Sequence, residues 1–210
     1  MPDRALLNET NREWQALRAR LGETEPRSGS GAGGPRFPVS PTALYAQMEE
    51  VLLAWRELGD DRLERLEGRF VNGAWTLKDL LGHLASWAAE FRREVETVAA
   101  GGAFDYAIPF ALSVLGPNEW NARAVEDQRP RSLRAIRSAF EAETRRLQDL
   151  VLAMPREVLY GPTDFPLAPT GDPRIPFRGN VAQIVFGKCE HDNHHLGQIR
   201  RWLERVESER

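Results

Sequence analysis

The sequence predicts an all-α protein whose core is a four-helix bundle. Four segments carry apolar residues at the three-and-four spacing of a helix that buries one face. These segments begin near residues that favour a helix N-terminus, and no segment shows the sustained alternation that indicates a strand. A length of 210 residues fits one domain with an appendage, because domains contain roughly 150 residues. Long amphipathic helices without strands make a bundle the simplest fold.

The N-terminal part of the chain is predicted to be an appendage. Residues 3–22 could form a helix, but its apolar stripe is thin. Residues 27–41 follow and are rich in Gly, Ser and Pro, a composition that buries too little apolar surface to fold. We therefore expect two parts: an extra helix on a flexible linker over residues 1–39, and the bundle domain over residues 40–210.

The first two bundle helices are predicted from their caps and stripes. One begins after Ser40, with Pro41 at its first position. The next begins at Thr76, where Asp79 completes a capping-box pattern, and ends at the glycine pair 101–102. The apolar stripes are Leu44, Met48, Val51, Trp55 and Leu58 in the first helix, and Leu77, Leu80, Leu81, Leu84, Trp87, Ala88, Phe91, Val95 and Val98 in the second.

The second half of the chain supplies two further long helices. A short helix is predicted over residues 118–128, and the third long helix follows Ser132. Residues 155–179 carry six prolines and are predicted to form a long loop. Asn180 is predicted to cap the last helix, with Gln183 at the capping-box position. The last two stripes are Leu133, Ile136, Phe140, Leu147, Leu150 and Met154, and then Ile184, Val185, Leu196, Ile199, Trp202 and Val206.

Composition and charge exclude several classes of function. The 28 Lys and Arg and 31 Asp and Glu residues give a net charge of −3, and the basic residues form no single block, which disfavours nucleic-acid binding. No stretch approaches the roughly 20 apolar residues that cross a bilayer, and the N-terminus resembles no signal peptide. The single cysteine, Cys189, excludes an intramolecular disulfide. We therefore expect a cytoplasmic protein that binds neither nucleic acid nor membranes.

Three of the four histidines fall within five residues: His191, His194 and His195. On a helix, His191 and His195 lie one turn apart on nearly the same face, so both imidazoles can converge on one ion at roughly 2.0–2.2 Å. His194 lies about 100° from His195 around the axis and points less well toward that ion. The pair indicates a metal site, but two ligands do not complete one.

The fourth histidine, His83, interrupts the apolar stripe of the second bundle helix between Leu80 and Trp87. An imidazole that points inward needs a hydrogen-bond partner or a metal, because an unsatisfied buried polar group is costly. A satisfied core histidine and a metal ligand both fit this position, and the histidine pair on another core helix favours the ligand. Three histidines from two helices would leave an open coordination position, which is typical of catalytic sites.

Two motifs resemble those of the DinB/YfiT-like superfamily. The segment W-T-L-K-D-L-L-G-H-L-A-S-W at 75–87 is similar to its second-helix signature, and H-D-N-H-H-L-G-Q-I at 191–199 is similar to its fourth-helix signature. The resemblance extends over residues 40–206 and implies an up-down-down-up bundle that binds a divalent metal. The ligands that it implies are His83, His191 and His195. The segment N-E-W-N-A-R at 118–123 also resembles the ClbS/DfsB branch, many members of which lack these histidines.

The superfamily resemblance implies an activity and its cofactors. Three imidazoles suit zinc, nickel, copper or iron, of which we expect zinc or nickel. Known activities of the superfamily include thiol-dependent transferases and isomerases, and hydrolases of electrophilic small molecules. We therefore expect a metal-dependent stress or detoxification enzyme with a small-molecule substrate, performing S-transfer from a low-molecular-weight thiol, or hydrolysis. The alternative is a non-catalytic bundle that binds or sequesters a toxic compound. Homodimers are common in the superfamily, which makes a homodimer the candidate assembly.

Glu90 is the first candidate for a catalytic role beside the metal. It lies seven residues after His83, on the same stripe one helical repeat later. A carboxylate there could orient an imidazole or act as a general base. The alternative is a surface glutamate paired with Arg92 or Arg93.

Gln198 is the second candidate, seven residues after His191. Its amide could contact the substrate or a metal-bound water, and a polar residue at the edge of the bundle is the alternative. Cys189 lies about 160° from His191 around the helix and is predicted to be a buried, inert thiol. We expect the site at one end of the bundle, near the segment 155–179.

Overall fold

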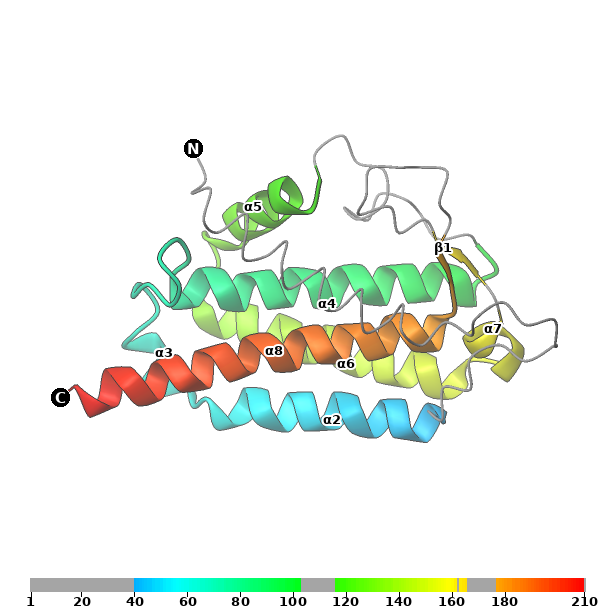
Figure 1. The fold of residues 1–210 in the computed structure, drawn as a ribbon, viewed down its shortest axis with the longest axis horizontal. Helices are drawn as coiled ribbons and strands as arrows, with labels where there is room; N and C mark the ends of the chain where they lie inside the picture. Colours follow the sequence, from blue (N-terminus) through cyan, green and yellow to red (C-terminus); the bar gives the residue numbers. More distant parts are fainter. Residues whose placement is uncertain (1–39, 103–115, 162, 166–176, 210) are drawn as a thin grey trace.

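The computed structural model describes residues 40–102, 116–161, 163–165 and 177–209. The predicted N-terminal helix and linker, residues 1–39, lie outside the described residues. Four long helices dominate the described part of the chain (Figure 1) and confirm the all-α prediction. They are α2 (Pro41–Glu57), α4 (Leu77–Ala99), α6 (Leu133–Ala153) and α8 (Val181–Ser208).

The long helices form an up-down-down-up bundle. The colours of Figure 1 show that α2 and α8 run in one direction, and α4 and α6 in the opposite one. Both α2 and α4 pack against α6 and α8. The short helix α3 (Asp60–Glu64) follows α2, and the crossover between the parallel helices α4 and α6 contains α5 (Gly116–Gln128). This topology is the one that the superfamily resemblance implies.

Local sequence signals fix the helix ends as predicted. Ser40 and Ser132 each accept a hydrogen bond from the backbone N–H three residues later, at 3.1 and 3.2 Å. Such caps satisfy N–H groups that have no partner within the helix. The two predicted capping boxes are formed by Thr76 with Asp79 and by Asn180 with Gln183. Helix α4 ends before Gly101, whose φ of 81° is a left-handed conformation that favours glycine.

The apolar stripes of the four helices meet in one core. Within this core, Trp55 of α2 stacks on Phe140 of α6, and their ring centroids are 4.1 Å apart. Burying one large apolar side chain contributes about 1.5–3 kcal/mol, so the packed stripes are the main stabilising feature of the fold. The predicted stripe residues are buried, except that Phe91 and Leu150 are partly buried against the same core.

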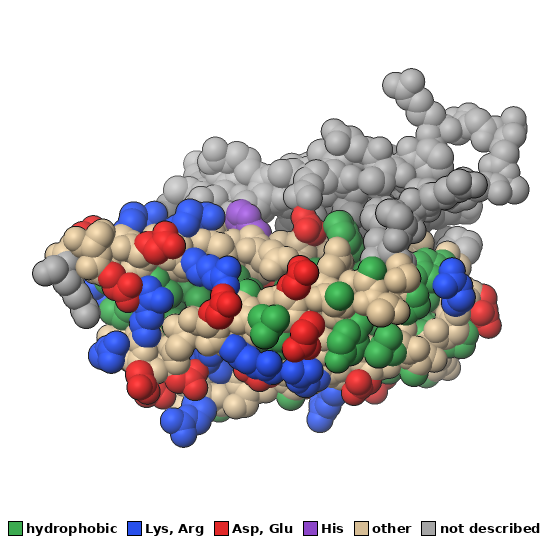
Figure 2. All heavy atoms as spheres, turned by 90° about the horizontal axis from the view of Figure 1, so that it is seen from below, with side chains coloured by type: hydrophobic (Ala, Val, Ile, Leu, Met, Phe, Trp, Pro, Cys, Tyr) green, Lys and Arg blue, Asp and Glu red, His purple; other side chains and the backbone are tan. Residues whose placement is uncertain are grey.

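The outer faces of the helices carry charges of both signs. Figure 2 shows acidic and basic side chains interspersed on one face of the molecule. Ion pairs connect neighbouring helices, for example from Arg145 to Glu49 at 3.3 Å and from Arg56 to Glu141 at 3.3 Å. Along the described part of the chain, no helix is both long and apolar enough to cross a bilayer.

The predicted loop over residues 155–179 contains regular structure, so this prediction is wrong in part. Helix α7 (Arg156–Tyr160) buries Leu159 in the core. Strand β1 (Thr163–Phe165) pairs antiparallel with β2 (Phe177–Gly179). Strands of three residues are too short to show alternation, and their pairing joins positions far apart in the sequence, which no local pattern indicates.

Candidate metal centre

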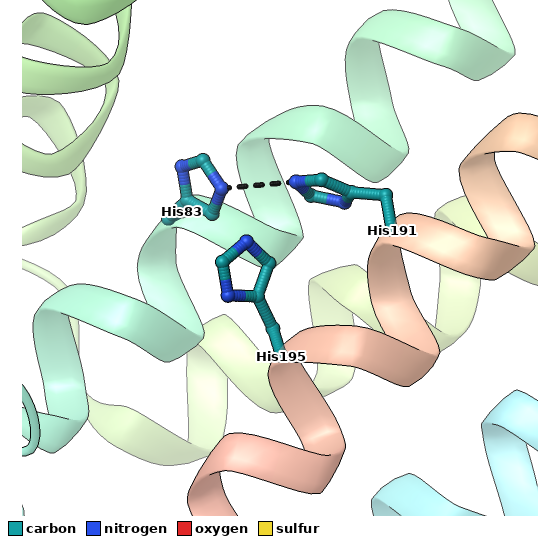
Figure 3. Close-up of side chains that lie close together, drawn as sticks. All are labelled: His83, His191 and His195. Carbon is teal, nitrogen blue, oxygen red and sulfur yellow. Dashed lines mark hydrogen bonds between the residues drawn. The ribbon is translucent and has the colours of Figure 1, made fainter. Parts of the chain in front are cut away.

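Three histidines from two helices converge between α4 and α8. Figure 3 shows the ring of His83, from α4, directed toward the rings of His191 and His195, from α8. The Nε2 atoms of His83 and His191 are 3.1 Å apart. One nitrogen from each of the three rings lies within 4.8 Å of the others. The structure thus brings together the three residues that the sequence predicts as metal ligands.

The two histidines of α8 have oxygen acceptors beside Nδ1. His195 Nδ1 lies 2.8 Å from the side-chain oxygen of Gln198, and His191 Nδ1 lies 3.2 Å from a carboxylate oxygen of Asp192. Because these oxygens accept hydrogen bonds, we assign the proton of both rings to Nδ1. Each Nε2 then presents a lone pair toward the space between α4 and α8, as metal coordination requires.

Asp192, which holds the His191 proton, is itself a buried charge. Its side chain is fully buried and forms an ion pair with the equally buried Lys188, one turn earlier on α8. Burial by itself would raise the pKa of Asp192, but the Lys188 charge and the His191 hydrogen bond outweigh it and keep this pKa below its ordinary value. An ionised Asp192 is a strong acceptor, which favours the proton on His191 Nδ1.

His83 has a different environment. The ring is 2% exposed, and its Nδ1 has no hydrogen-bond partner among the described residues. Burial, followed by the nearby His195 and His191, lowers the pKa of His83 well below 6.5, so the ring is neutral at neutral pH. Aromatic rings contact it instead: the centroid of Trp75 lies at 4.8 Å and that of Trp87 at 6.2 Å.

The three histidines fit a divalent metal ion. Three nitrogens at 2.0–2.1 Å from a tetrahedral zinc ion would lie about 3.3 Å from one another. The 3.1 Å contact between Nε2 of His83 and Nε2 of His191 is already at this separation, and the three ligand atoms all lie within 4.8 Å of one another. With both α8 rings protonated on Nδ1, the Nε2 lone pairs of His191 and His195 lie close to Nε2 of His83, and a shared ion would bridge these three atoms. Three imidazoles also leave a coordination position for a substrate.

Helix α5 packs along α4 beside the histidines. Trp87 donates its Nε1–H to the side-chain oxygen of Asn121 at 3.0 Å, and its ring lies 4.3 Å from that of Trp120. The residue before His83 is Gly82, and a Cβ there would lie 2.8 Å from the Cβ of Gln128. Glycine at this position therefore permits the close approach of α5, which fixes the aromatic side of the centre.

The two predicted catalytic residues lie in different surroundings. Gln198 contacts the centre through His195, and its side-chain nitrogen lies 3.0 Å from Nε2 of the exposed His194. Glu90 accepts a hydrogen bond from Arg93 at 2.8 Å and contacts none of the three histidines in the described part of the chain. Glu90 thus forms the ion pair that was its alternative interpretation, and Gln198 touches a candidate ligand directly.

Cys189 matches its prediction as a buried thiol outside the ligand set. It is 2% exposed, and burial raises its pKa to about 12. The centre lies near the middle of α8, because His191 and His195 are ten and fourteen residues after its first residue, Val181. The described part of the segment 155–179 lies at the N-terminal end of α8 (Figure 1), so the expected place of the site beside that segment is wrong for these residues.

Sequence reasoning missed several residues around the centre: Trp75, Asn121, Thr144 (whose hydroxyl lies 3.4 Å from the Lys188 ammonium), Lys188 and Asp192. One signal was available for the last two. Lys188 and Asp192 are one turn apart and share the interior face of the last helix with Ile184, so two opposite charges interrupt an apolar stripe. The other contacts join residues from different helices or from a turn, and no local pattern indicates them.

The up-down-down-up topology and the three convergent histidines define a four-helix-bundle protein with a candidate metal centre. The described bundle has the fold of the DinB/YfiT-like superfamily, and the family model that matches just under half of the chain belongs to that superfamily. Residues 71–174 match the family model described as the mycothiol maleylpyruvate isomerase N-terminal domain. The matched segment contains His83 and ends before His191 and His195.

Two solved structures are similar to this chain in fold. A crystal structure of a protein from Streptococcus pneumoniae has a TM-score of 0.62 and 14% identity, covering 77% of this chain and 89% of that one. The crystal structure of the mycothiol-dependent maleylpyruvate isomerase has a TM-score of 0.56 and 13% identity, covering 77% of this chain. This chain spans 61% of that isomerase, which is less than two thirds of its length. A search of curated proteins found no matching sequence.

Proposed function

We propose that this protein is a metal-dependent enzyme that transfers a low-molecular-weight thiol to a small electrophilic compound. The observation that carries the metal part is the convergence of three Nε2 atoms, from His83, His191 and His195, between α4 and α8. The thiol part is supported by the match of residues 71–174 to a family that is named for mycothiol. Zinc or nickel is the ion that we expect in this donor set.

A divalent ion held by three imidazoles would stabilise a bound thiol or water as its anion near neutral pH. The residues of the chain prepare the site for that chemistry. Asp192 and Gln198 hold the protons of His191 and His195 on Nδ1, which leaves both Nε2 lone pairs directed at the site. Trp75 covers one side of His83, which reduces the access of water to that ligand.

Glu90 is the candidate general base of this proposal. It lies on α4 one helical repeat after His83, and its carboxylate is 16% exposed. To take the proton that the thiol or a water loses, it must exchange its hydrogen bond with Arg93 for one to the substrate. Replacement by Gln removes the base and keeps an acceptor for Arg93, so Glu90→Gln should reduce turnover without loss of metal.

Elemental analysis tests the metal part of the proposal. Protein purified without a histidine tag should carry about one equivalent of metal, or take it up from added Zn²⁺ or Ni²⁺. His195→Ala should lose it, whereas the matched control His194→Ala should keep it, because His194 is exposed and lies outside the convergent set. Equal metal content in all three proteins, or none after addition, would contradict the proposal. Absence of metal would favour the alternative of a non-catalytic small-molecule binding protein.

A thiol screen then separates the two reactions. The metal-loaded enzyme is assayed with electrophilic compounds, with and without mycothiol and other low-molecular-weight thiols. Turnover that requires a thiol supports S-transfer, and turnover without one indicates hydrolysis. A small-molecule substrate, a cytoplasmic location and a homodimer belong to the same proposal, and light scattering of the purified protein tests the dimer.

A further inference from the structure

The interior of the bundle contains an ion pair behind the histidines. Lys188 and Asp192 lie one turn apart on α8, and both side chains are completely buried. Lys188 also lies 3.4 Å from the hydroxyl of Thr144 on α6, and its ammonium is 5.2 Å from the centroid of Phe140. The pair is therefore enclosed between α6 and α8.

Packing alone does not require charges at these two positions. Removing two charges from water costs more than their attraction often returns, and apolar side chains of similar size commonly serve a core equally well or better. The neighbours of the pair on α8 include Val185, Cys189 and Leu196, all of them in the apolar core. A buried ion pair in such surroundings needs another explanation.

The hydrogen bonds of Asp192 connect the pair to the candidate metal centre. One carboxylate oxygen contacts Lys188, and the other lies 3.2 Å from Nδ1 of His191. The two oxygens are thus divided between a fixed cation and a candidate ligand. Lys188 has Thr144 as a second contact, so the carboxylate is anchored to α6 as well as to α8.

We propose that Lys188 and Asp192 are a positioning pair for His191, in which Lys188 fixes the Asp192 carboxylate and Asp192 fixes the ring and its proton. This inference rests on the metal site of the proposed function. A carboxylate that accepts from Nδ1–H orients a ligand imidazole and increases its basicity. Lys188 prevents rotation of Asp192 away from the ring. The partner of His195 at Nδ1 is the neutral amide of Gln198, so Lys188 and Asp192 act on His191 only.

The test removes the pair without leaving a buried charge. Asp192→Asn alone would strand Lys188 in the core and could prevent folding. The double variant Lys188→Met with Asp192→Leu removes both charges and the acceptor and keeps side chains of comparable length and branching. We expect it to fold and to bind Zn²⁺ about 10- to 100-fold more weakly than the wild type in a competition titration, as for other lost partners of ligands.

A second readout follows the ring proton directly in the metal-free protein. The imidazole ¹⁵N shifts of His191 should show the Nδ1–H form in the wild type and a mixture of both forms in the double variant. Asp60→Asn is the matched control, because it removes the carboxylate partner of another buried cation, Arg137, which contacts none of the three histidines in the described residues. The control should keep both the Zn²⁺ affinity and the His191 proton position.

The outcomes separate this inference from the proposed function. Wild-type Zn²⁺ affinity together with an unchanged His191 proton in the double variant would show that the pair is only structural. If the wild type binds no Zn²⁺ but His191 still loses its fixed proton in the variant, the positioning role stands and the metal proposal fails. If the proton position is mixed already in the wild type, the inference fails whatever the metal does.

Discussion

The two helices of the histidine centre hold their rings by different means. On α8, each ring has a polar partner at Nδ1, a buried carboxylate for His191 and an amide for His195. On α4, the single ring of His83 has no partner at Nδ1 and is enclosed by aromatic side chains. We call the α8 side of the centre, with His191 and His195, the polar wall, and the α4 side, with His83, the apolar wall.

This difference shows two ways to fix an imidazole. A hydrogen bond sets both the direction of the ring and the place of its proton. Packing sets the direction alone, and the buried nitrogen without a partner then costs free energy in the metal-free protein. The candidate ligands on α8 are therefore oriented by hydrogen bonds in the metal-free protein, whereas His83 is oriented mainly by packing.

The largest expected effect comes from replacing the ligand of the apolar wall. His83→Leu should reduce Zn²⁺ affinity by more than about 100-fold, because loss of a ligand exceeds the loss of an outer partner. The metal-free variant should be about as stable as the wild type, since replacing the unsatisfied buried Nδ1 by an apolar side chain offsets the loss of the 3.1 Å hydrogen bond to Nε2 of His191. Zn²⁺ titration and urea unfolding of the metal-free proteins measure the two effects.

His195→Leu is the contrasting variant for this prediction. It also loses the metal, but it removes the hydrogen bond to Gln198 and should lower the free energy of unfolding by about 0.5–1.5 kcal/mol. The same change in stability for both variants would contradict the distinction between a polar and an apolar wall.

The next effect concerns the close packing of α5 on the apolar wall. In Gly82→Ala the new Cβ would lie 2.8 Å from Cβ of Gln128, an atom fixed to the backbone of α5, so α5 itself must move. We expect a loss of about 1–3 kcal/mol in the free energy of unfolding. Gly187→Ala on α8 is the matched control, because its Cβ would have no neighbour within 4 Å, and it should gain up to about 1 kcal/mol. Thermal unfolding measures the stability of both variants. A similar loss of stability in both would contradict the steric explanation for Gly82.

We also expect His83, on the apolar wall, to make the stability of the metal-free protein depend on pH. Burial, then His195 and His191, lowers the pKa of His83 well below 6.5. The unfolded chain then binds a proton below pH 6.5 that the folded chain does not bind, so the metal-free protein loses stability as the pH falls from about 6.5 toward the folded pKa. This group contributes at most about 1.4 kcal/mol per pH unit. Urea unfolding between pH 7.5 and 5 measures it, and His83→Leu should have a shallower slope.

The distinction between local signals and long-range contacts explains how much of the protein the sequence could predict. The helix starts at Ser40, Thr76 and Asn180 were predictable because a cap needs only residues three positions away. The convergence of the three histidines was predictable because His191 and His195 are neighbours on one helix and His83 interrupts an apolar stripe. These signals are local or periodic.

The remaining features depend on contacts between distant segments. The Asn121 partner of Trp87 comes from α5, and Thr144 meets Lys188 from α6. The β1–β2 pair likewise joins short segments with no period of their own. A single sequence contains no pattern for such contacts. The observed partner of Glu90 is the nearby Arg93, and its role as a general base stays a prediction.

The smallest expected effect is on the polar wall, at the neutral partner of His195. Gln198→Leu removes the amide that accepts from His195 Nδ1–H. Because the amide is uncharged and partly exposed, the loss in Zn²⁺ affinity should be near the lower limit for outer partners, about 10-fold. Glu90→Gln is the control and should keep the affinity within about twofold, since Glu90 contacts Arg93 rather than a ligand. If Gln198→Leu weakens Zn²⁺ binding more than loss of the Lys188–Asp192 pair does, the charged partner is not the stronger one, and the ranking within the polar wall is reversed.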